Sequence, residues 1–172
     1  RELLDCDRVL IYQFLPDGDG AITAESVGLK VKSILGELIY DPCFAQKWWG
    51  LYLKGKFSVI EDTQTKPMEP CYANLLARMQ VRANLVMPIL IGQKVSKHLF
   101  GLLLAHQCDR PRQWQDQEIS LLQNISTQLG IALRNKTQRK KIEATIIEST
   151  KRWQYAMDSS GDGIWDWNLQ TN

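Results

Sequence analysis

Residues 83–107, ANLVMPILIGQKVSKHLFGLLLAHQ, decide the fold of this chain. Both ends of the stretch, residues 83–91 and 99–107, are predominantly apolar, which is typical of buried β-strands. The polar segment 92–98 between them is short enough to join antiparallel neighbours. Pro88 lacks a backbone N–H, so its place inside the first of these strands predicts an edge position or a bulge.

Two further strands precede this pair and are expected to form a hairpin. Residues 8–14 (RVLIYQF) and 21–27 are rich in β-branched and aromatic residues, and the segment 16–20 (PDGDG) between them has the composition of a turn. Residues 57–61 form another short predicted strand. Helices are expected over residues 41–52 and 72–80, and residues 34–40 are expected to form a loop or a short helix.

From residue 116 the apolar residues recur at intervals of three and four, which predicts an amphipathic helix. The apolar stripe continues beyond the basic segment 134–141, a solvated helix face, with Ile142, Ile146, Trp153 and Met157. Because such a helix is longer than one small domain needs, we expect residues 116 to about 157 to transmit a signal and to mediate homodimerisation. The predicted fold is therefore α+β, with an antiparallel sheet, helices on one face, a pocket on the other and a long C-terminal linker helix.

The composition excludes several classes of protein. A net charge of +2 is too small to indicate a nucleic-acid partner, and no apolar run approaches the ~20 residues of a membrane helix. Four cysteines without CxxC or zinc-finger spacing predict a reduced, cytoplasmic chain without a structural metal. Because the chain begins at Arg1 rather than Met, we expect a segment of a longer protein.

Two cysteines carry the chemical signal of the sequence. Cys43 follows Asp41 and Pro42, and Cys71 follows Pro70, so each thiol is expected in the first turn of a helix. Free N–H groups and the positive end of the helix dipole favour a thiolate there. Two activated thiols indicate covalent chemistry, either with a ligand or with each other.

Four motifs resemble one known family. The segments 6–14 (CDRVLIYQF), 20–27 (GAITAESV), 77–90 (ARMQVRANLVMPIL) and 100–115 (FGLLLAHQCDRPRQWQ) are similar, in this order, to the bilin-binding GAF domains of cyanobacteriochromes, the cyanobacterial relatives of phytochromes. Residues 41–44 (DPCF) resemble the Asp-x-Cys-Phe motif of one lineage, and residues 152–172 resemble the opening of a PAS domain. We therefore expect a GAF domain at 1–133, a linker helix at 134–158 and the start of an incomplete PAS domain at 159–172.

The resemblance implies a photoreceptor domain rather than an enzyme. Cys71 would attach a linear tetrapyrrole (bilin) by a thioether, and light would isomerise the bridge between rings C and D. Cys43 would add reversibly to the central bridge, giving a blue or violet state that alternates with a state between teal and orange. A C-terminal output domain would receive the signal.

The resemblance also implies polar contacts to the pigment. Asp41 is expected near the pyrrole nitrogens, His106 at the D-ring end, and Arg82 and Asn84 near polar groups such as the propionates. The further candidates for the binding surface are aromatic: Phe44, Trp48, Trp49, Tyr52 and Tyr72.

Two positions depart from the family pattern. Tyr72 stands where the family usually has His after the anchoring cysteine, and that His is linked to conversion of phycocyanobilin into phycoviolobilin. Tyr72 therefore favours retained phycocyanobilin over phycoviolobilin. Phe100 stands where many members have Trp, which alters the expected stacking near ring D.

Two other functions fit a GAF domain from the sequence alone. A thiol enzyme that reduces free methionine sulfoxide would use Cys43 and Cys71 as nucleophile and resolving thiol. A cyclic-nucleotide sensor would carry an Asn-Lys…Phe-Asp-Glu pattern, of which only Asn135 and Lys136 occur, in the linker. The colour of protein made in cells that supply phycocyanobilin separates these alternatives from a photoreceptor.

Overall fold

The computed structural model describes residues 1–16, 18–40, 48–92 and 97–160. These fall into two compact units, Arg1–Leu133 and Arg134–Asn172, which are treated separately below. The first unit begins with a short 3-10 helix, η1 (Glu2–Leu4).

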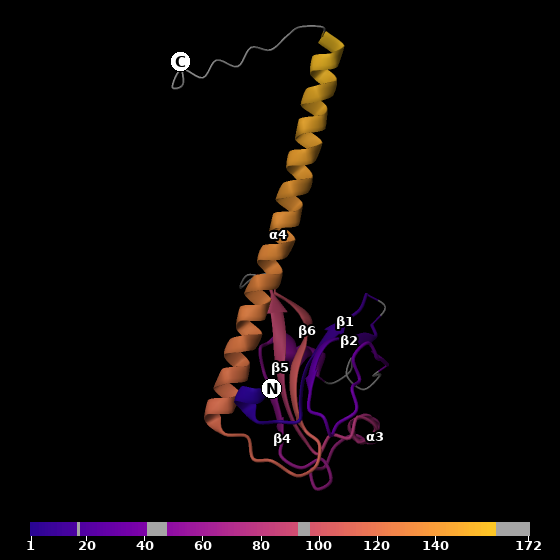
Figure 1. The fold of residues 1–172 in the computed structure, drawn as a ribbon, viewed down its shortest axis with the longest axis vertical. Coiled ribbons are helices and arrows are strands. Elements are labelled where there is room, and N and C mark those ends of the chain that lie inside the picture. Colours follow the sequence, from indigo (N-terminus) through magenta and orange to yellow (C-terminus); the bar gives the residue numbers. More distant parts are fainter. Residues whose placement is uncertain (17, 41–47, 93–96, 161–172) are drawn as a thin grey trace. The chain divides into compact units, whose positions relative to one another are not determined.

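The first unit is built on an antiparallel sheet of six strands in the order β3-β2-β1-β6-β5-β4 (Figure 1). The strands are β1 (Arg8–Phe14), β2 (Gly20–Val27), β3 (Leu38–Ile39), β4 (Ser58–Ile60), β5 (Ala83–Ile91) and β6 (His98–Gln107). The predicted α+β class and antiparallel sheet are confirmed. The two apolar strands that decide the fold, β5 and β6, pair along their whole length, and β1 pairs with the other side of β6.

One strand differs from the sequence expectation. Residues 34–40 were expected to form a loop or a short helix, but Leu38–Ile39 adds to the edge of the sheet beside Gly20 and Ala21. Two residues are too few to show an alternating pattern, so propensity could not reveal this strand.

Pro88 is accommodated as its chemistry predicts. In the described residues β4 pairs only with Asn84–Val86 of β5, so Pro88 has a strand neighbour on the β6 side alone, and a bulge follows at Ile89. Its carbonyl oxygen accepts a hydrogen bond of 2.6 Å from the hydroxyl of Ser126.

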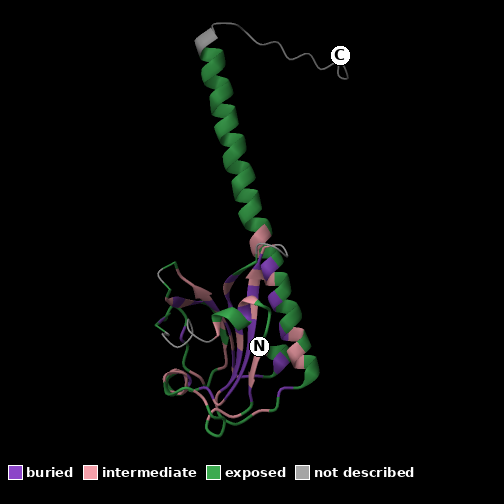
Figure 2. Ribbon diagram, turned by 180° about the vertical axis from the view of Figure 1, so that it is seen from behind, coloured by how far each residue is buried: buried purple, intermediate pink, exposed green. Residues whose placement is uncertain are grey.

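One face of the sheet packs on the beginning of helix α4 (Asp116–Ser160). The core on this face contains Leu85, Met87, Ile89 and Leu103 from the sheet and Leu122 from the helix, each at most 3% exposed. Figure 2 shows this half of α4 with a buried stripe against the sheet. The helix approaches the sheet closely, since a side chain at Gly130 would place its Cβ 2.2 Å from the carbonyl oxygen of Leu90.

Arg112 ties the start of α4 to the rest of the domain. Its guanidinium donates to the backbone oxygens of Leu4 and Asp5, to the side chain of Gln107 at the end of β6, and to Glu118 in the first turn of α4. The same guanidinium lies 4.8 Å from the ring centroid of Trp114. Strand β6 and helix α4 are therefore held together at the same end of the domain.

The opposite face of the sheet is covered by two short helices, α2 (Trp49–Leu53) and α3 (Pro70–Arg78). The core on this face includes Leu10, Ile22 and Leu102 from the sheet, Tyr52 from α2 and Leu76 from α3. The expectation of helices on one face only is therefore wrong, because α2 and α3 share the pocket face while α4 covers the other.

The second unit continues helix α4 from Arg134. Residues 135–158 are exposed along their whole length (Figure 2). The predicted apolar stripe is exposed with them, as Ile142 and Ile146 are each 59% and Trp153 64% accessible. The PAS-like segment lies outside the described residues from 161 onward. Among the described helices, none combines the length and the apolarity needed to cross a bilayer.

Candidate functional site

A cavity opens between the sheet and the helices α2 and α3. Its apolar walls are the nine side chains of Leu10, Ile22, Ile39, Leu75, Leu76, Met79, Val86, Leu102 and Leu104. Its polar and aromatic groups are Tyr12, Trp48, Tyr52, Ser58, Tyr72 and His106. Four of the residues predicted from the sequence therefore line one cavity: Trp48, Tyr52, Tyr72 and His106. A largely apolar pocket with a few placed polar groups is the usual form of a small-molecule site.

The cavity is narrow in this arrangement of side chains. Its empty space amounts to about 630 Å³ when the part open to solvent is included. The space in which a water-sized molecule can be centred is only about 60 Å³. A ligand of several hundred Å³ therefore enters only if the walls move apart.

Helix α3 places Cys71 and Tyr72 at its beginning. Glu69 takes the extended conformation before the helix, and Pro70 begins it, as suits a residue without an N–H. The predicted helix thus starts two residues earlier than its apolar pattern indicates. Cys71 is half-buried in the first turn, and the structure has its sulfur in a disulfide. Chemistry at this sulfur with a ligand therefore begins with reduction.

Tyr72 is fixed by a partner on the sheet. The side-chain amide of Asn84 donates a 3.0 Å hydrogen bond to the Tyr72 hydroxyl oxygen. Asn84 is fully buried, and its amide oxygen has no hydrogen-bond partner in the part of the chain that the structure describes. Of this pair, Tyr72 lines the cavity, and Asn84 holds the phenol in place from β5.

Trp48 and Trp49 are adjacent in the sequence and contact different parts of the domain, as expected for neighbouring residues in a helical turn. Trp48 stacks on Tyr52 with ring centroids 6.1 Å apart, and both rings line the cavity. Burial raises the pKa of the Tyr52 phenol, so it stays protonated. Trp49 is 39% exposed and packs edge-to-face on Phe14, outside the described cavity lining.

His106 lies in the cavity wall in the middle of a polar row across the sheet. It faces Arg8 on β1 and Asn84 on β5 in register. It is 0% exposed, and burial, followed by the nearby Arg8 charge, lowers the pKa of its imidazole to about 3. The Nδ1 atom lies 3.5 Å from an Arg8 nitrogen, whereas Nε2 has no hydrogen-bond partner in the described residues.

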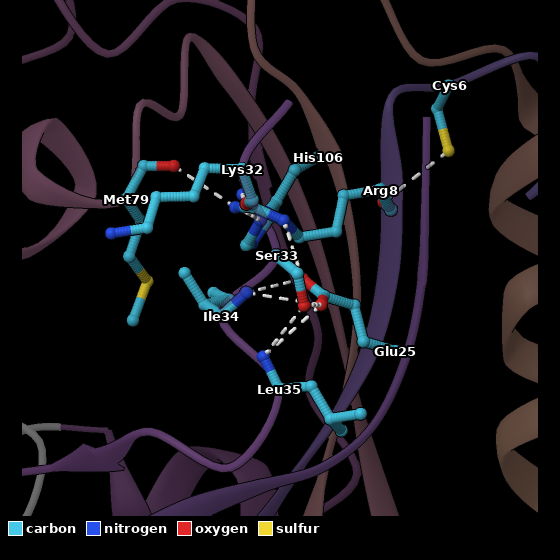
Figure 3. A network of polar contacts seen from close by, with 9 residues as sticks. All are labelled: Cys6, Arg8, Glu25, Lys32, Ser33, Ile34, Leu35, Met79 and His106. Atoms are coloured by element: carbon cyan, nitrogen blue, oxygen red, sulfur yellow. Dashed lines mark hydrogen bonds and ion pairs between the residues drawn. The ribbon is translucent and has the colours of Figure 1, made fainter. Parts of the chain in front are cut away.

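Arg8 and Glu25 were not anticipated from the sequence (Figure 3). The Arg8 Nε atom lies 3.0 Å from Glu25 Oε1, and the two side chains are 1% and 2% exposed. The two side chains form a buried ion pair, while Nε itself makes no hydrogen bond in the described residues. Arg8 also donates to the backbone oxygens of Met79 and Lys32, at 3.0 Å and 2.7 Å.

Glu25 fastens the loop that follows β2. Its carboxylate accepts hydrogen bonds from the backbone N–H groups of Ile34 and Leu35 and from the Ser33 hydroxyl (Figure 3). The sequence does hold a signal for this network. Arg8 and Glu25 interrupt two apolar strands of one predicted hairpin, and such charges pair diagonally across antiparallel strands.

Arg82 has a partner outside the cavity. It forms a bidentate pair with Asp62, at 2.8 Å and 3.1 Å, and is not among the described cavity-lining residues. The hydrogen bond from Arg82 is the main reason that the pKa of Asp62 falls to about 2. Phe100 also lies elsewhere, since it packs against the core on the α4 face.

The remaining predicted residues, Asp41, Cys43 and Phe44, lie outside the described residues. The other two cysteines are free thiols, and burial raises the pKa of Cys6 and, to about 11, that of Cys108. Neither is therefore activated as a nucleophile. Among the described residues no group of three or more His, Cys, Asp or Glu side chains could hold a metal ion.

Comparison with known proteins places this architecture in a family. The GAF domain model matches residues 1–133. A circadian input-output histidine kinase, CikA, from Thermosynechococcus vestitus is 34% identical over 178 residues, which cover 92% of this chain and 23% of the kinase. A putative methyl-accepting chemotaxis protein from Synechocystis sp. is 38% identical over 133 residues, 77% of this chain and 13% of that protein. The chain thus spans less than a quarter of either relative.

Solved structures agree with this placement. The blue-light-absorbing form of the PixJ GAF domain from Thermosynechococcus elongatus has a TM-score of 0.79 at 35% identity, covering 86% of each chain. The green-light-absorbing state of TePixJ, described as an active cyanobacteriochrome domain, has a TM-score of 0.74 at 36% identity, covering 84% of this chain and 86% of that chain. A far-red-absorbing protein with bound biliverdin has a TM-score of 0.71 at 28% identity, covering 78% of this chain and 83% of that chain. The chain therefore belongs to the GAF domain family, with close structural relatives among the GAF domains of cyanobacteriochromes.

Proposed function

We propose that residues 1–133 bind a linear tetrapyrrole covalently and act as the light-sensing domain of a larger signalling protein. The observation that carries this proposal is the position of Cys71. It lies in the first turn of α3, directly before Tyr72, which lines the cavity together with His106. The solved relatives that resemble this chain are light-absorbing domains, and one of them holds biliverdin.

The chemistry of the cavity fits such a pigment. Nε2 of His106, a cavity-lining residue, and Oδ1 of Asn84, which hydrogen-bonds the cavity-lining Tyr72, are buried and have no hydrogen-bond partner in the described residues. Leaving such atoms unpaired costs about 1–3 kcal/mol each, and lactam, pyrrole or carboxyl groups of a bilin could pair with them. The apolar walls and the Trp48–Tyr52 stack suit a flat conjugated ring system. Binding would require the walls to separate, because the present space is narrow.

Each residue has a distinct part in the proposal. Cys71, once reduced, supplies the sulfur for the thioether. His106, which stays neutral because of its buried position, hydrogen-bonds a polar group of the pigment without adding charge. Arg82 would contact a propionate only by leaving Asp62. When bound, the bilin supplies the chemistry of light absorption and isomerisation between rings C and D.

The finer parts of the proposal concern the photocycle. Cys43 would form the second, reversible bond to the pigment, with Asp41 and Phe44 beside it in the sequence. Tyr72 would keep phycocyanobilin from converting to phycoviolobilin, since a phenol held by Asn84 is a weaker base than the usual imidazole. Breaking and forming the second bond would switch the domain between a blue or violet state and a state of longer wavelength.

The output side rests on helix α4. The exposed apolar residues Ile142, Ile146 and Trp153 would pair with a second copy of the chain. A shift in rotation or register along the paired helices would pass the signal to a C-terminal output domain, such as the kinase of the CikA relative. The chain would work in the cytoplasm, a reducing compartment in which the Cys71 disulfide would open to the free thiol that the proposal requires.

The experiment that tests this proposal asks whether the pigment is attached covalently to Cys71. Protein made in cells that supply phycocyanobilin, under reducing conditions, should give a zinc-fluorescent band on a denaturing gel. Cys71→Ala should lose that band, whereas Cys108→Ala, which changes a thiol outside the cavity, should keep it. A full-strength band from Cys71→Ala would overturn the attachment site, and colourless wild-type protein would overturn the proposed function.

A further inference from the structure

The guanidinium of Arg8 occupies an unusual position for a charged group, buried against the sheet and beside the cavity-lining His106. It is 1% exposed. Its terminal nitrogens donate to the backbone oxygens of Met79 and Lys32 and contact Nδ1 of His106, and its Nε lies 3.0 Å from Glu25, so the group is held from several sides (Figure 3). A buried ion pair contributes little net stability compared with apolar residues of similar volume. We therefore look for the role of this network in its effect on the adjacent His106 ring rather than in the stability of the fold.

The neighbour on which it acts is His106. Arginine has no hydrogen-bond acceptor and remains protonated, so the 3.5 Å contact between its terminal nitrogen and Nδ1 of His106 is compatible only with an unprotonated Nδ1. A neutral imidazole then carries its hydrogen on Nε2. The adjacent positive charge also opposes protonation of the ring as a whole.

We propose that Arg8 is a positioning residue that fixes His106 as the neutral tautomer with hydrogen on Nε2, so that the cavity is offered a hydrogen-bond donor. The groups that suit this donor are carbonyl and lactam oxygens. Glu25 takes part by neutralising Arg8 and by holding it through the loop at Ser33, Ile34 and Leu35. The choice of ligand group rests on the proposed pigment, whereas the tautomer is a property of the protein alone.

The tautomer can be read directly by nitrogen-15 NMR on pigment-free protein labelled in histidine. The chain has only two histidines, and the other one, His98, is exposed and serves as an internal reference. In the wild type, His106 should show one protonated nitrogen, Nε2, and one unprotonated nitrogen, Nδ1. At a length of 3.5 Å, the contact with the charged donor should favour the matching tautomer by about tenfold.

The informative variant is Arg8→Met combined with Glu25→Gln, which removes both charges and leaves neither one buried alone. Without the donor at Nδ1, the ratio of the Nε2–H tautomer to the Nδ1–H tautomer should fall by about tenfold. The nitrogen-15 chemical shifts of both ring nitrogens should then lie between the protonated and unprotonated values. The matched control is Arg82→Met combined with Asp62→Asn, which removes a second arginine–carboxylate pair, partly exposed, for which no contact with His106 is described. It should leave the His106 shifts unchanged.

The results separate this inference from the proposed function. Hydrogen on Nδ1 in the wild type would overturn the inference, even where the double variant fails to fold. An unchanged tautomer in the folded double variant would also overturn it. In pigment-loaded protein, the double variant should keep the zinc-fluorescent band but show a shifted absorption maximum. Absence of pigment from the wild type would contradict the proposed function and leave the tautomer result standing.

Discussion

Acid should destabilise this domain through one buried side chain, His106. Its pKa is about 3 in the folded protein, against an ordinary value of 6.5 in an unfolded chain. A lowered histidine pKa means that the unfolded chain binds the proton first. The contribution of the neutral ring to stability is therefore complete above pH 6.5 and is lost as the pH falls from 6.5 toward 3.

The magnitude follows from the two pKa values. At pH 5 the unfolded imidazole is about thirtyfold more protonated than neutral, while the folded one remains neutral. Linkage gives a loss of about 2 kcal/mol between pH 8 and pH 5. Small domains have a total stability of about 5–15 kcal/mol, so this loss is easily measured.

The assay is urea unfolding of pigment-free protein at the two pH values, for the wild type and for His106→Gln. Glutamine does not titrate, and its carbonyl can accept the hydrogen bond from Arg8. Carboxylates contribute equally to both proteins, so the variant should lose about 2 kcal/mol less than the wild type on acidification. His98→Gln, at an exposed position, should behave as the wild type does. An equal loss in the wild type and His106→Gln would refute the reasoning.

Four further predictions test packing, the photocycle and assembly. Leu122→Ala should lower the free energy of unfolding, measured in urea, by about 2–5 kcal/mol because the Leu122 side chain is 1% exposed. Gln123 is exposed, so Gln123→Ala should change this free energy by less than about 0.5 kcal/mol. Gly130→Ala should lower the free energy of unfolding by about 1–3 kcal/mol because its Cβ would lie 2.2 Å from the Leu90 carbonyl oxygen. Gly50→Ala, whose Cβ would have nothing within 4 Å, should not lower it, and equal effects of the two variants would contradict the close approach of α4. Cys43→Ala should abolish the short-wavelength state yet keep the zinc-fluorescent band, and an unchanged blue state would reduce Cys43 to a packing role. Ile142→Glu combined with Ile146→Glu should shift sedimentation from dimer to monomer, and a monomeric wild type would remove the dimer.

The sheet could be predicted closely because its strands are long and strongly apolar. The bounds of β1 and β5 agree with the sequence prediction, and β2 and β6 differ by one residue. The sequence prediction was less accurate for elements and element ends that contain too few residues to show a periodic apolar pattern. The two residues of β3 form a strand only because β2 lies beside them, and α3 begins at Pro70 because the first turn needs no N–H from it.

The site was partly predictable for a similar reason. Aromatic residues and a histidine on predicted elements could be named, and Tyr72, Tyr52, Trp48 and His106 do meet in one cavity. Arg8 was not identified, because its role depends on register. It reaches His106 only through the β1–β6 pairing, which joins residues far apart in the sequence.

The most direct test of the central claim is one pair of absorption spectra. Protein made in cells that supply phycocyanobilin should be coloured, and illumination should interconvert a violet-to-blue band and a band at markedly longer wavelength. The same change should be absent from Cys71→Ala. Colourless wild-type protein, or a coloured protein whose spectrum does not change with light, would contradict the account.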